Sequence, residues 1–298
     1  MRGVVVALGN FDGVHLGHQA VMRRAVEEGR RRGARVVAAT FDPHPRAILG
    51  PRVQPKLLTT LELRREALLR YGADEVRVIR FDQELSKKSP KEFVGDVLVG
   101  EIGAEAVVVG ENFRFGHRAA GDVAELERLM RSYGAEVFAV AVEDEAGKGG
   151  ISSTRIRELV AQGEVGLAAS LLGRPYVLRG EVAVGDRRGR ILGFPTANVV
   201  PDQAVVVPAR GVYAGFVRVG KALYPACTNV GLAPTFERGE SRVEAYLIDF
   251  EGDLYGRVVD VSFVRRIRPE KRFSGVEELK EQIARDVEAA RRITKDTI

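Results

Sequence analysis

Two histidines stand three residues apart in a glycine-rich stretch near the beginning of the chain. The stretch reads Gly9-Asn10-Phe11-Asp12-Gly13-Val14-His15-Leu16-Gly17-His18. At the start of a helix this spacing puts His15 and His18 on one face, where both imidazoles can donate to phosphate oxygens beside the positive end of the helix dipole. The glycines allow close approach of the backbone. The pattern predicts a nucleotidyl-transfer site, where fixed charges stabilise the α-phosphate of a nucleoside triphosphate while a phosphate nucleophile displaces pyrophosphate.

This stretch joins a predicted buried strand at residues 4–8 to a predicted helix at 19–32. It lacks the Lys-Ser or Lys-Thr ending of a Walker A loop, and its spacing differs from that of the dinucleotide fingerprint. The alternative is a surface turn with two solvated histidines. The strand–loop–helix context argues against that alternative, because helix starts of this kind bind phosphate in open α/β sheets.

Strand-like and helix-like segments continue to alternate as far as Gly163. Further strands are expected at 35–40, 76–81, 106–109 and 137–142, and helices at 61–71, from 89 onward, at 122–133 and at 154–162. Regular alternation predicts a parallel sheet covered by helices on both faces, with ligands at the carboxyl ends of its strands.

Two loops of the first half carry aromatic residues. In Thr40-Phe41-Asp42-Pro43-His44-Pro45, two prolines stiffen the chain and the phenylalanine can pack against a flat ring; a simple proline turn is the alternative. In Gly110-Glu111-Asn112-Phe113-Arg114-Phe115-Gly116, the asparagine can read polar ring edges, and the phenylalanines can stack on a ligand or merely pack together.

The last helix of the first half begins with Ile151-Ser152-Ser153-Thr154-Arg155-Ile156-Arg157. Hydroxyl groups and unpaired backbone N–H groups gather at such a helix start, and Arg157 lies one turn further on. The stretch is therefore either a second anion site or an ordinary Ser/Thr cap.

From about residue 175 the pattern changes to short strands separated by Gly/Pro turns. Strands are expected at 182–184, 204–207, 211–219, 222–227, 243–250 and 258–264. They predict a closed antiparallel barrel. A final helix, capped by Ser274 and Glu277, is expected to cover the barrel core with an apolar stripe of Val276, Leu279, Ile283, Val287 and Ala290.

The second half carries a longer glycine-rich motif, Gly185-Asp186-Arg187-Arg188-Gly189-Arg190-Ile191-Leu192-Gly193-Phe194-Pro195-Thr196-Ala197-Asn198. Its glycines let the backbone approach phosphates, and its arginines add positive charge. Thr196 and Asn198 point the same way along an extended chain. Two neutral oxygen ligands suit Mg²⁺, which takes waters and substrate phosphates for its other positions. A basic hairpin turn is the alternative.

A carboxylate is the expected proton acceptor of the second half, because all four histidines lie in the first half. Glu244 shares one face of its predicted strand with Tyr246 and Ile248, so it is a candidate. A glutamate exposed at the rim of the sheet is the alternative.

The composition suits two domains and a small anionic ligand. The chain has 298 residues and a net charge of +5 that is spread along the sequence, which fits nucleotides. It has no dense basic block for nucleic acid. A single cysteine, Cys227, excludes an intramolecular disulfide framework and a cysteine-cluster metal site. The first residues match neither a signal peptide nor a membrane span, so no membrane partner and a cytoplasmic location are expected.

These motifs resemble, in order and from about residue 5 to 292, those of the bacterial bifunctional riboflavin kinase/FAD synthetase family. The resemblance implies a Rossmann-like nucleotidyltransferase domain at 1–174 and a riboflavin kinase β-barrel with a C-terminal helix at 175–298. It implies phosphorylation of riboflavin to FMN and adenylylation of FMN to FAD, with ATP as co-substrate and Mg²⁺ as cofactor. Two positions depart from the family pattern: Tyr246 replaces a histidine, and Arg118 stands one place before the usual arginine.

The resemblance also implies roles for individual residues. The catalytic residues would be Glu244, His15 and His18. The ATP-binding residues would be Gly9, Asn10, Phe11, Gly13, Gly17, Ser153, Thr154, Arg157, Gly185, Gly189, Arg190 and Gly193. The flavin-binding residues would be Phe41, Pro43, Asn112, Phe113, Phe115, Arg268 and Glu270, and the metal ligands Thr196 and Asn198.

Two other functions are compatible with parts of the sequence. One is a different nucleotidyltransferase joined to a non-catalytic barrel. The other is a flavin-binding regulatory protein with weak or absent catalysis. The intact Pro-Thr-Ala-Asn sequence and the retained Glu244 and histidines argue against both.

Overall fold

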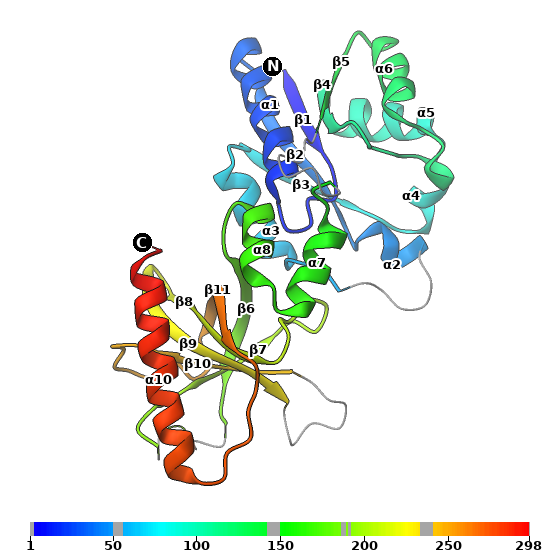
Figure 1. Cartoon of the computed structure of the whole chain (residues 1–298). Helices are drawn as coiled ribbons and strands as arrows, with labels where there is room; N and C mark the ends of the chain where they lie inside the picture. Colours follow the sequence, from blue (N-terminus) through cyan, green and yellow to red (C-terminus); the bar gives the residue numbers. More distant parts are fainter. Residues whose placement is uncertain are drawn as a thin grey trace. The chain divides into compact units, whose positions relative to one another are not determined.

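The computed structural model describes residues 3–49, 56–141, 150–185, 189, 192–232 and 241–297. By their contacts, the residues form two compact units, 1–55 with 61–153 and 56–60 with 154–298 (Figure 1). The helical segment that follows Ser153 belongs to the second unit, although the sequence pattern groups it with the first domain. None of the described helices combines the length and the hydrophobicity that crossing a membrane requires.

The first unit is built on a parallel sheet, which confirms the predicted β–α alternation. Its strands are β1 (Val4–Leu8), β2 (Arg35–Asp42), β3 (Glu75–Arg80), β4 (Ala104–Gly110) and β5 (Glu136–Val140), in the order β3-β2-β1-β4-β5. The order reverses between β1 and β4, and ligands of such sheets bind at that point, outside the carboxyl ends of the strands.

Helices cover both faces of this sheet. One face packs on α1 (Leu16–Arg32) and α3 (Leu61–Arg70), and the other on η1 (Phe93–Glu101) and α6 (Val123–Arg131). Short helices fill the connections: α2 (Pro45–Leu49), α4 (Gln83–Lys87), α5 (Pro90–Glu92) and η2 (His117–Ala119).

Helix α1 begins three residues earlier than its apolar pattern predicts. His15 is its N-cap: it has an extended backbone, and its Nδ1 accepts the His18 backbone N–H at 3.3 Å. Gly33 ends the helix in the left-handed conformation. Because of this early start, the glycine-rich loop and the first turn of α1 overlap in sequence.

A buried arginine connects the loops that follow β1 and β2. Arg64, on α3, has 1% of its surface exposed. Its Nη1 donates to Thr40 Oγ1 at 3.3 Å and to the Phe41 carbonyl at 3.2 Å. The Thr40 hydroxyl in turn donates to the Asn10 carbonyl at 2.9 Å. One guanidinium therefore ties the end of β2 to the loop after β1.

The second unit contains two helices, a closed barrel and a long C-terminal helix. The helices are α7 (Ser153–Gln162), whose first residue still belongs to the first unit, and α8 (Val165–Leu172), which Gly173 ends in the left-handed conformation. The strands are β6 (Tyr176–Ala183), β7 (Ala197–Pro201), β8 (Gly211–Val219), β9 (Ala222–Leu232), β10 (Ser241–Leu247) and β11 (Val258–Arg268). They close in the order β10-β7-β6-β11-β8-β9 with antiparallel pairing, as predicted.

The strand prediction at 204–207 is wrong, and β7 was not predicted. Residues 204–207 form a single bridge, between Val205 and Leu57, although Val205 and Val206 are buried. Pro208 has no N–H to extend a ladder. Short apolar segments can be buried without being strands, and the ladder of the barrel runs instead through the end of the glycine-rich motif.

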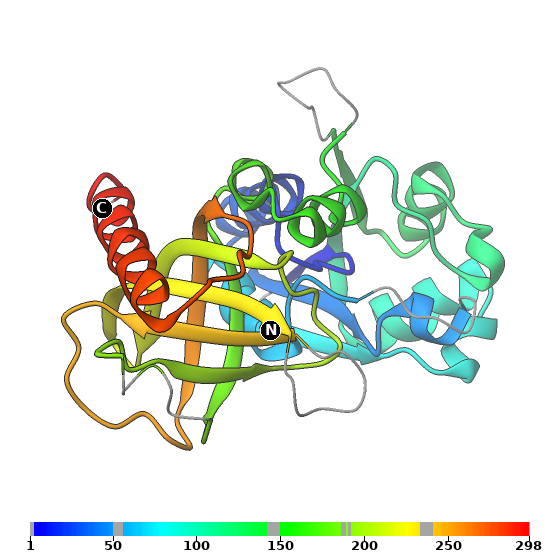
Figure 2. The same ribbon diagram turned by 60° about the horizontal axis from the view of Figure 1, so that its bottom comes forward.

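The last helix, α10 (Val276–Lys295), packs on β8, β9 and β11 (Figure 2). Its predicted capping box is wrong. The N-cap is Gly275, with no side-chain cap bond, and Ser274 donates from its N–H and hydroxyl to Glu278 at 3.0 and 2.7 Å. The first turn therefore engages the carboxylate one residue beyond the predicted position.

Replacing Arg64 by alanine is predicted to weaken the first unit. Buried acceptors that lose their donor cost about 1–3 kcal/mol. Arg64→Ala should lower the free energy of unfolding of this unit by about that amount and speed amide exchange at residues 9–18 and 40–43. Arg65, the exposed neighbour on α3, is the matched control, and Arg65→Ala should stay within about 0.5 kcal/mol. If urea unfolding showed the same loss of unfolding free energy for Arg64→Ala and Arg65→Ala, Arg64 would not stabilise the contact between these loops.

Candidate active sites

The loop after β1 brings the two predicted histidines together. The rings of His15 and His18 stack with centroids 3.6 Å apart and an interplanar angle of 17°. Phe11 is buried and meets His18 edge to face at 5.2 Å. The loop needs unusual backbone conformations, with positive φ at Phe11, Gly13 and Val14. The chain thus holds both imidazoles in one orientation at the start of α1.

The other predicted nucleotide-binding residues differ in where they lie. The Ser153 hydroxyl donates to the Asp12 carbonyl at 2.9 Å, which brings the first residue of α7 against the loop. Gly17 is buried in the first turn of α1, while Asn10 is exposed. Arg157 and Thr154 belong to the second unit, where their side chains are 3.5 Å apart.

The predicted flavin residues of the first unit fall into two groups. Phe41 and Phe115 are buried in the core. The ring centroid of Phe93 lies 6.4 Å from that of Phe41 and 5.8 Å from that of Phe115. The rings of Phe41 and Phe115 therefore support the two loops from within the core. Pro43 and Asn112 are exposed, and Phe113 is half-buried and stacks on Phe115 at 5.8 Å. These three residues offer the accessible surface of the two loops.

The barrel carries two adjoining pockets. Pocket A, of about 610 Å³, is lined by Thr196, Asn198 and the turn at 250–255. Pocket B, of about 430 Å³, has an apolar wall. That wall consists of Leu192, Phe194, Val212, Tyr246, Leu279, Ile283 and Val287. Four residues line both pockets: Gly189, Thr196, Arg242 and Glu244.

The register of β10 places Glu244 beside the predicted metal ligand. Glu244 stands directly opposite Asn198 on β7 and Asn229 on β9. Arg242 donates from Nε and Nη2 to Asn198 Oδ1 at 3.0 and 2.8 Å, and its Nη2 lies 2.9 Å from Glu244 Oε1. Strand pairing therefore assembles an amide, a carboxylate and a guanidinium at the wall between the pockets.

The glycine-rich motif approaches these residues closely. A Cβ at Gly185 would overlap the Asn198 amide, and a Cβ at Gly189 would overlap the Phe194 carbonyl. Gly193 has a φ of +86°, which favours glycine. Arg190 lies outside the described residues.

The predicted metal ligands have the oxygen chemistry that magnesium binds. The Thr196 hydroxyl and the Asn198 amide are hard ligands of the kind that Mg²⁺ prefers, and Asn198 Oδ1 accepts two N–H groups of Arg242 in this structure. Among the described residues, no group of three or more His, Cys, Asp or Glu side chains could hold a metal. A magnesium ion here would therefore take waters and substrate phosphates as its remaining ligands.

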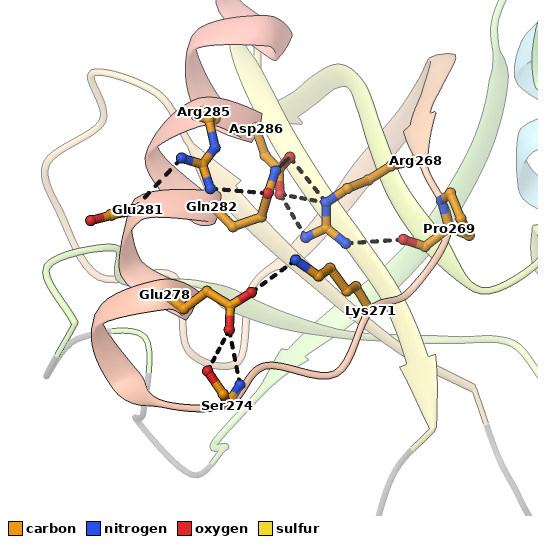
Figure 3. Close-up of polar contacts among 9 residues, drawn as sticks. All are labelled: Arg268, Pro269, Lys271, Ser274, Glu278, Glu281, Gln282, Arg285 and Asp286. Carbon is orange, nitrogen blue, oxygen red and sulfur yellow. Dashed lines mark hydrogen bonds and ion pairs between the residues drawn. The ribbon is translucent and has the colours of Figure 1, made fainter.

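An ion pair fixes one end of pocket B to α10 (Figure 3). Arg268 donates from Nε and Nη2 to the carboxylate of Asp286 at 2.7–3.1 Å, and Gln282 donates to the same carboxylate at 2.9 Å. Asp286 has 4% of its surface exposed. The Arg268 guanidinium thus forms part of the wall of pocket B. Its Nη1 also donates a hydrogen bond to the Pro269 carbonyl at 2.9 Å.

The segment after β11 is anchored to the same helix. Lys271 and Ser274 both bind Glu278, and their bonds lower its pKa to about 2 (Figure 3). Glu270, predicted to bind flavin, lies over Gly231, where an added Cβ would come 2.7 Å from its carboxylate. Helix α10 was expected to cover the barrel core. It also contributes Leu279, Ile283 and Val287 to the lining of pocket B.

Cys227 also lines pocket B, but its thiol is not reactive. Burial raises the pKa of this thiol to about 12. The thiol therefore stays protonated near neutral pH and serves as a small apolar group, as predicted.

Sequence reasoning missed Arg242, Asp286 and Arg64. Arg242 stands two residues before Glu244 and so on the same strand face, which is a signal that could have been used. Asp286 lies on the apolar face of α10, between Ile283 and Ala290, where a carboxylate is unusual and could have served as a signal. Arg64 carries no such signal, because arginine is common on exposed helix faces.

Two family models match the chain in succession. The model for FAD synthetase matches residues 1–155, and the model for riboflavin kinase matches residues 172–294. The two matches correspond to the parallel-sheet unit and to the barrel with its C-terminal helix.

Relatives match the whole length. The bifunctional riboflavin kinase/FMN adenylyltransferase of Escherichia coli K12 is 39% identical, over 97% of this chain and 92% of its own. The protein of that name from Listeria monocytogenes is 38% identical, over 96% and 91%. A crystal structure described as a macrolide-efflux protein from Streptococcus pneumoniae is 35% identical, with a TM-score of 0.88 over 97% of this chain and 94% of that one. The chain therefore belongs to the bifunctional riboflavin kinase/FMN adenylyltransferase family.

Proposed function

We propose that the chain carries out two successive steps of FAD biosynthesis. The second unit transfers a phosphate from ATP to riboflavin, and the first unit joins AMP from a second ATP to the resulting FMN. The observation that carries this function is the presence of both catalytic domains in one chain that matches its relatives over nearly their full length.

The kinase reaction is assigned to the wall between pockets A and B. Pocket B suits a flat apolar ring, and pocket A lies beside the glycine-rich motif, to which the phosphates of ATP are assigned. The hydroxyl of the ribityl chain then meets the γ-phosphate at the shared wall. Glu244 accepts the hydroxyl proton as that oxygen attacks phosphorus and ADP leaves. Mg²⁺, held by Thr196 and Asn198, would neutralise phosphate charge when bound.

The adenylylation is assigned to the loop after β1. A phosphate oxygen of FMN attacks the α-phosphorus of ATP, and pyrophosphate leaves. His15 and His18 donate to the phosphate oxygens, where charge increases in the transition state. Ser153, whose hydroxyl contacts this loop, binds the triphosphate.

The flavin of the adenylylation reaction contacts the accessible residues of the first unit. Pro43, Asn112 and Phe113 offer that surface, while Phe41 and Phe115 support it from the core. The ligands of the whole chain are thus riboflavin, FMN, FAD and ATP, and its place is the cytoplasm. The competing function, a flavin-binding regulator, would leave ATP unconsumed.

Substitution of Glu244 tests its role as the proton acceptor. Glu244→Gln keeps the shape of the side chain but cannot accept the proton. FMN formation should fall by about 10²–10⁴-fold, the usual contribution of a general base, while FAD formation from added FMN is unchanged. A rate of FMN formation within threefold of wild type would remove Glu244 from this role.

The converse change tests the first unit. His18→Ala removes a donor aimed at the phosphate, and FAD formation from FMN should fall by about 10²–10³-fold. Riboflavin phosphorylation by the same protein is the internal control. If both activities disappeared in a protein with an unchanged circular dichroism spectrum, the proposed separation of the two reactions would be wrong.

Substitution of Thr196 tests its role as a metal ligand. Thr196→Val replaces the hydroxyl by a methyl group of equal size, so the Mg²⁺ concentration that gives half-maximal FMN formation should rise about tenfold or more, by analogy with the loss of other metal-supporting groups. The FAD-forming step should keep its Mg²⁺ dependence. An unchanged titration of the kinase step would exclude Thr196 as a ligand.

A further inference from the structure

Arg242 has a position that neither the motifs nor the family match accounts for. It is the only cationic side chain among the described residues that line both pockets. Its side chain is 20% exposed, and that of its partner Glu244 is 26% exposed. The ion pair is therefore partly shielded from water, where a charge pair interacts more strongly than on an open surface.

The guanidinium joins two groups with different tasks. It donates twice to Asn198 Oδ1, the predicted metal ligand, and it pairs with Oε1 of Glu244, the predicted proton acceptor. Arginine can do this because its donors form a rigid planar fork. Because Arg242 pairs with Oε1, we assign the acceptance of the substrate proton to Oε2 of Glu244.

The strands do not depend on this contact for their own pairing. The backbone ladder joins β10 to β7 from Val243 to Ala245 and to β9 from Ser241 to Leu247. The contacts of Arg242 lie above this ladder, between side chains. Loss of these contacts should therefore leave the barrel folded, but the side chains of Glu244 and Asn198 would no longer be fixed in one orientation.

We propose that Arg242 is a positioning residue for phosphoryl transfer. It holds the Glu244 carboxylate and the Asn198 amide in a fixed relation, so that proton acceptor and phosphate-binding site are aligned before the substrates arrive. This inference rests on the proposed function of Glu244. Small errors in such alignment reduce rates strongly while binding is preserved, since the chemical step depends on geometry more steeply than binding does.

The barrel contains a matched control for this ion pair. Arg179 on β6 faces Asp260 on β11 and donates from Nε and Nη2 at 2.6 and 2.9 Å. Its side chain is 23% exposed, close to the value for Arg242, and it does not line pocket A or B. Arg179→Met thus removes a similar cross-strand pair at a place without a proposed role.

The test compares Arg242→Met, Arg242→Lys and Arg179→Met in the full-length protein. Arg242→Met should lower kcat for FMN formation by about 10–100-fold and change KM for riboflavin by less than threefold. Arg242→Lys keeps the charge without the fork and should recover part of the rate. Added guanidinium ion should partly restore Arg242→Met. Arg179→Met should leave kcat within threefold, and FAD formation from FMN should stay unchanged in all three.

Several outcomes would overturn the inference. They are a kcat for Arg242→Met within threefold of wild type, a loss carried by KM alone, and an equal loss in Arg179→Met. The combined change Arg242→Met with Glu244→Gln should be slower than Glu244→Gln alone by a smaller factor than Arg242→Met slows the wild type, because only the positioning of Asn198 is then still lost. If Glu244→Gln alone kept wild-type kcat, the role of Glu244 in the proposed function would fail. If Glu244→Gln lost activity while Arg242→Met kept it, only the present inference would fail.

Discussion

The register between β10 and β7 is the constraint on which the barrel site depends. Because β10 pairs with β7 on one side and β9 on the other, Glu244 is fixed opposite Asn198 and Asn229. A slip of one residue would turn every β10 side chain to the other face. Pockets A and B meet at Glu244 and Arg242, so the same register fixes where a hydroxyl and a phosphate can come together.

The first unit achieves its geometry by a different route. Its loop lies at the carboxyl end of β1, beside the point where the strand order reverses between β1 and β4. The backbone itself holds the imidazoles: positive φ values turn the loop, and His15 caps the helix that carries His18. Arg64 then ties this loop to the end of β2 from inside the core. Both units thus place flexible side chains on rigid elements, as precise chemistry requires.

Local signals in the sequence predicted most of the elements and the fold class. Alternating segments predicted the parallel sheet, and the helices expected from 89 and 122 begin at the N-caps Ser89 and Asp122. Of the predicted stripe of α10, Leu279, Ile283, Val287 and Ala290 face the barrel or pocket B, whereas Val276 is exposed. The failures concern contacts between distant residues. Apolar residues 204–207 read as a strand but pair at one position. Ser274 binds Glu278, a carboxylate that Lys271 also contacts. The link from Arg242 to Asn198 spans 44 residues, and only the closed barrel brings its ends together.

The central claim is that one chain makes FAD from riboflavin in two steps. The most direct measurement is a time course of flavin products after purified protein is mixed with riboflavin, ATP and Mg²⁺. FMN should appear first and then decline as FAD accumulates, with ADP and pyrophosphate as by-products. FMN as the end product would contradict the role given to the first unit. Bound riboflavin with no FMN, no FAD and no ATP consumed would contradict the whole account and identify a flavin-binding regulator.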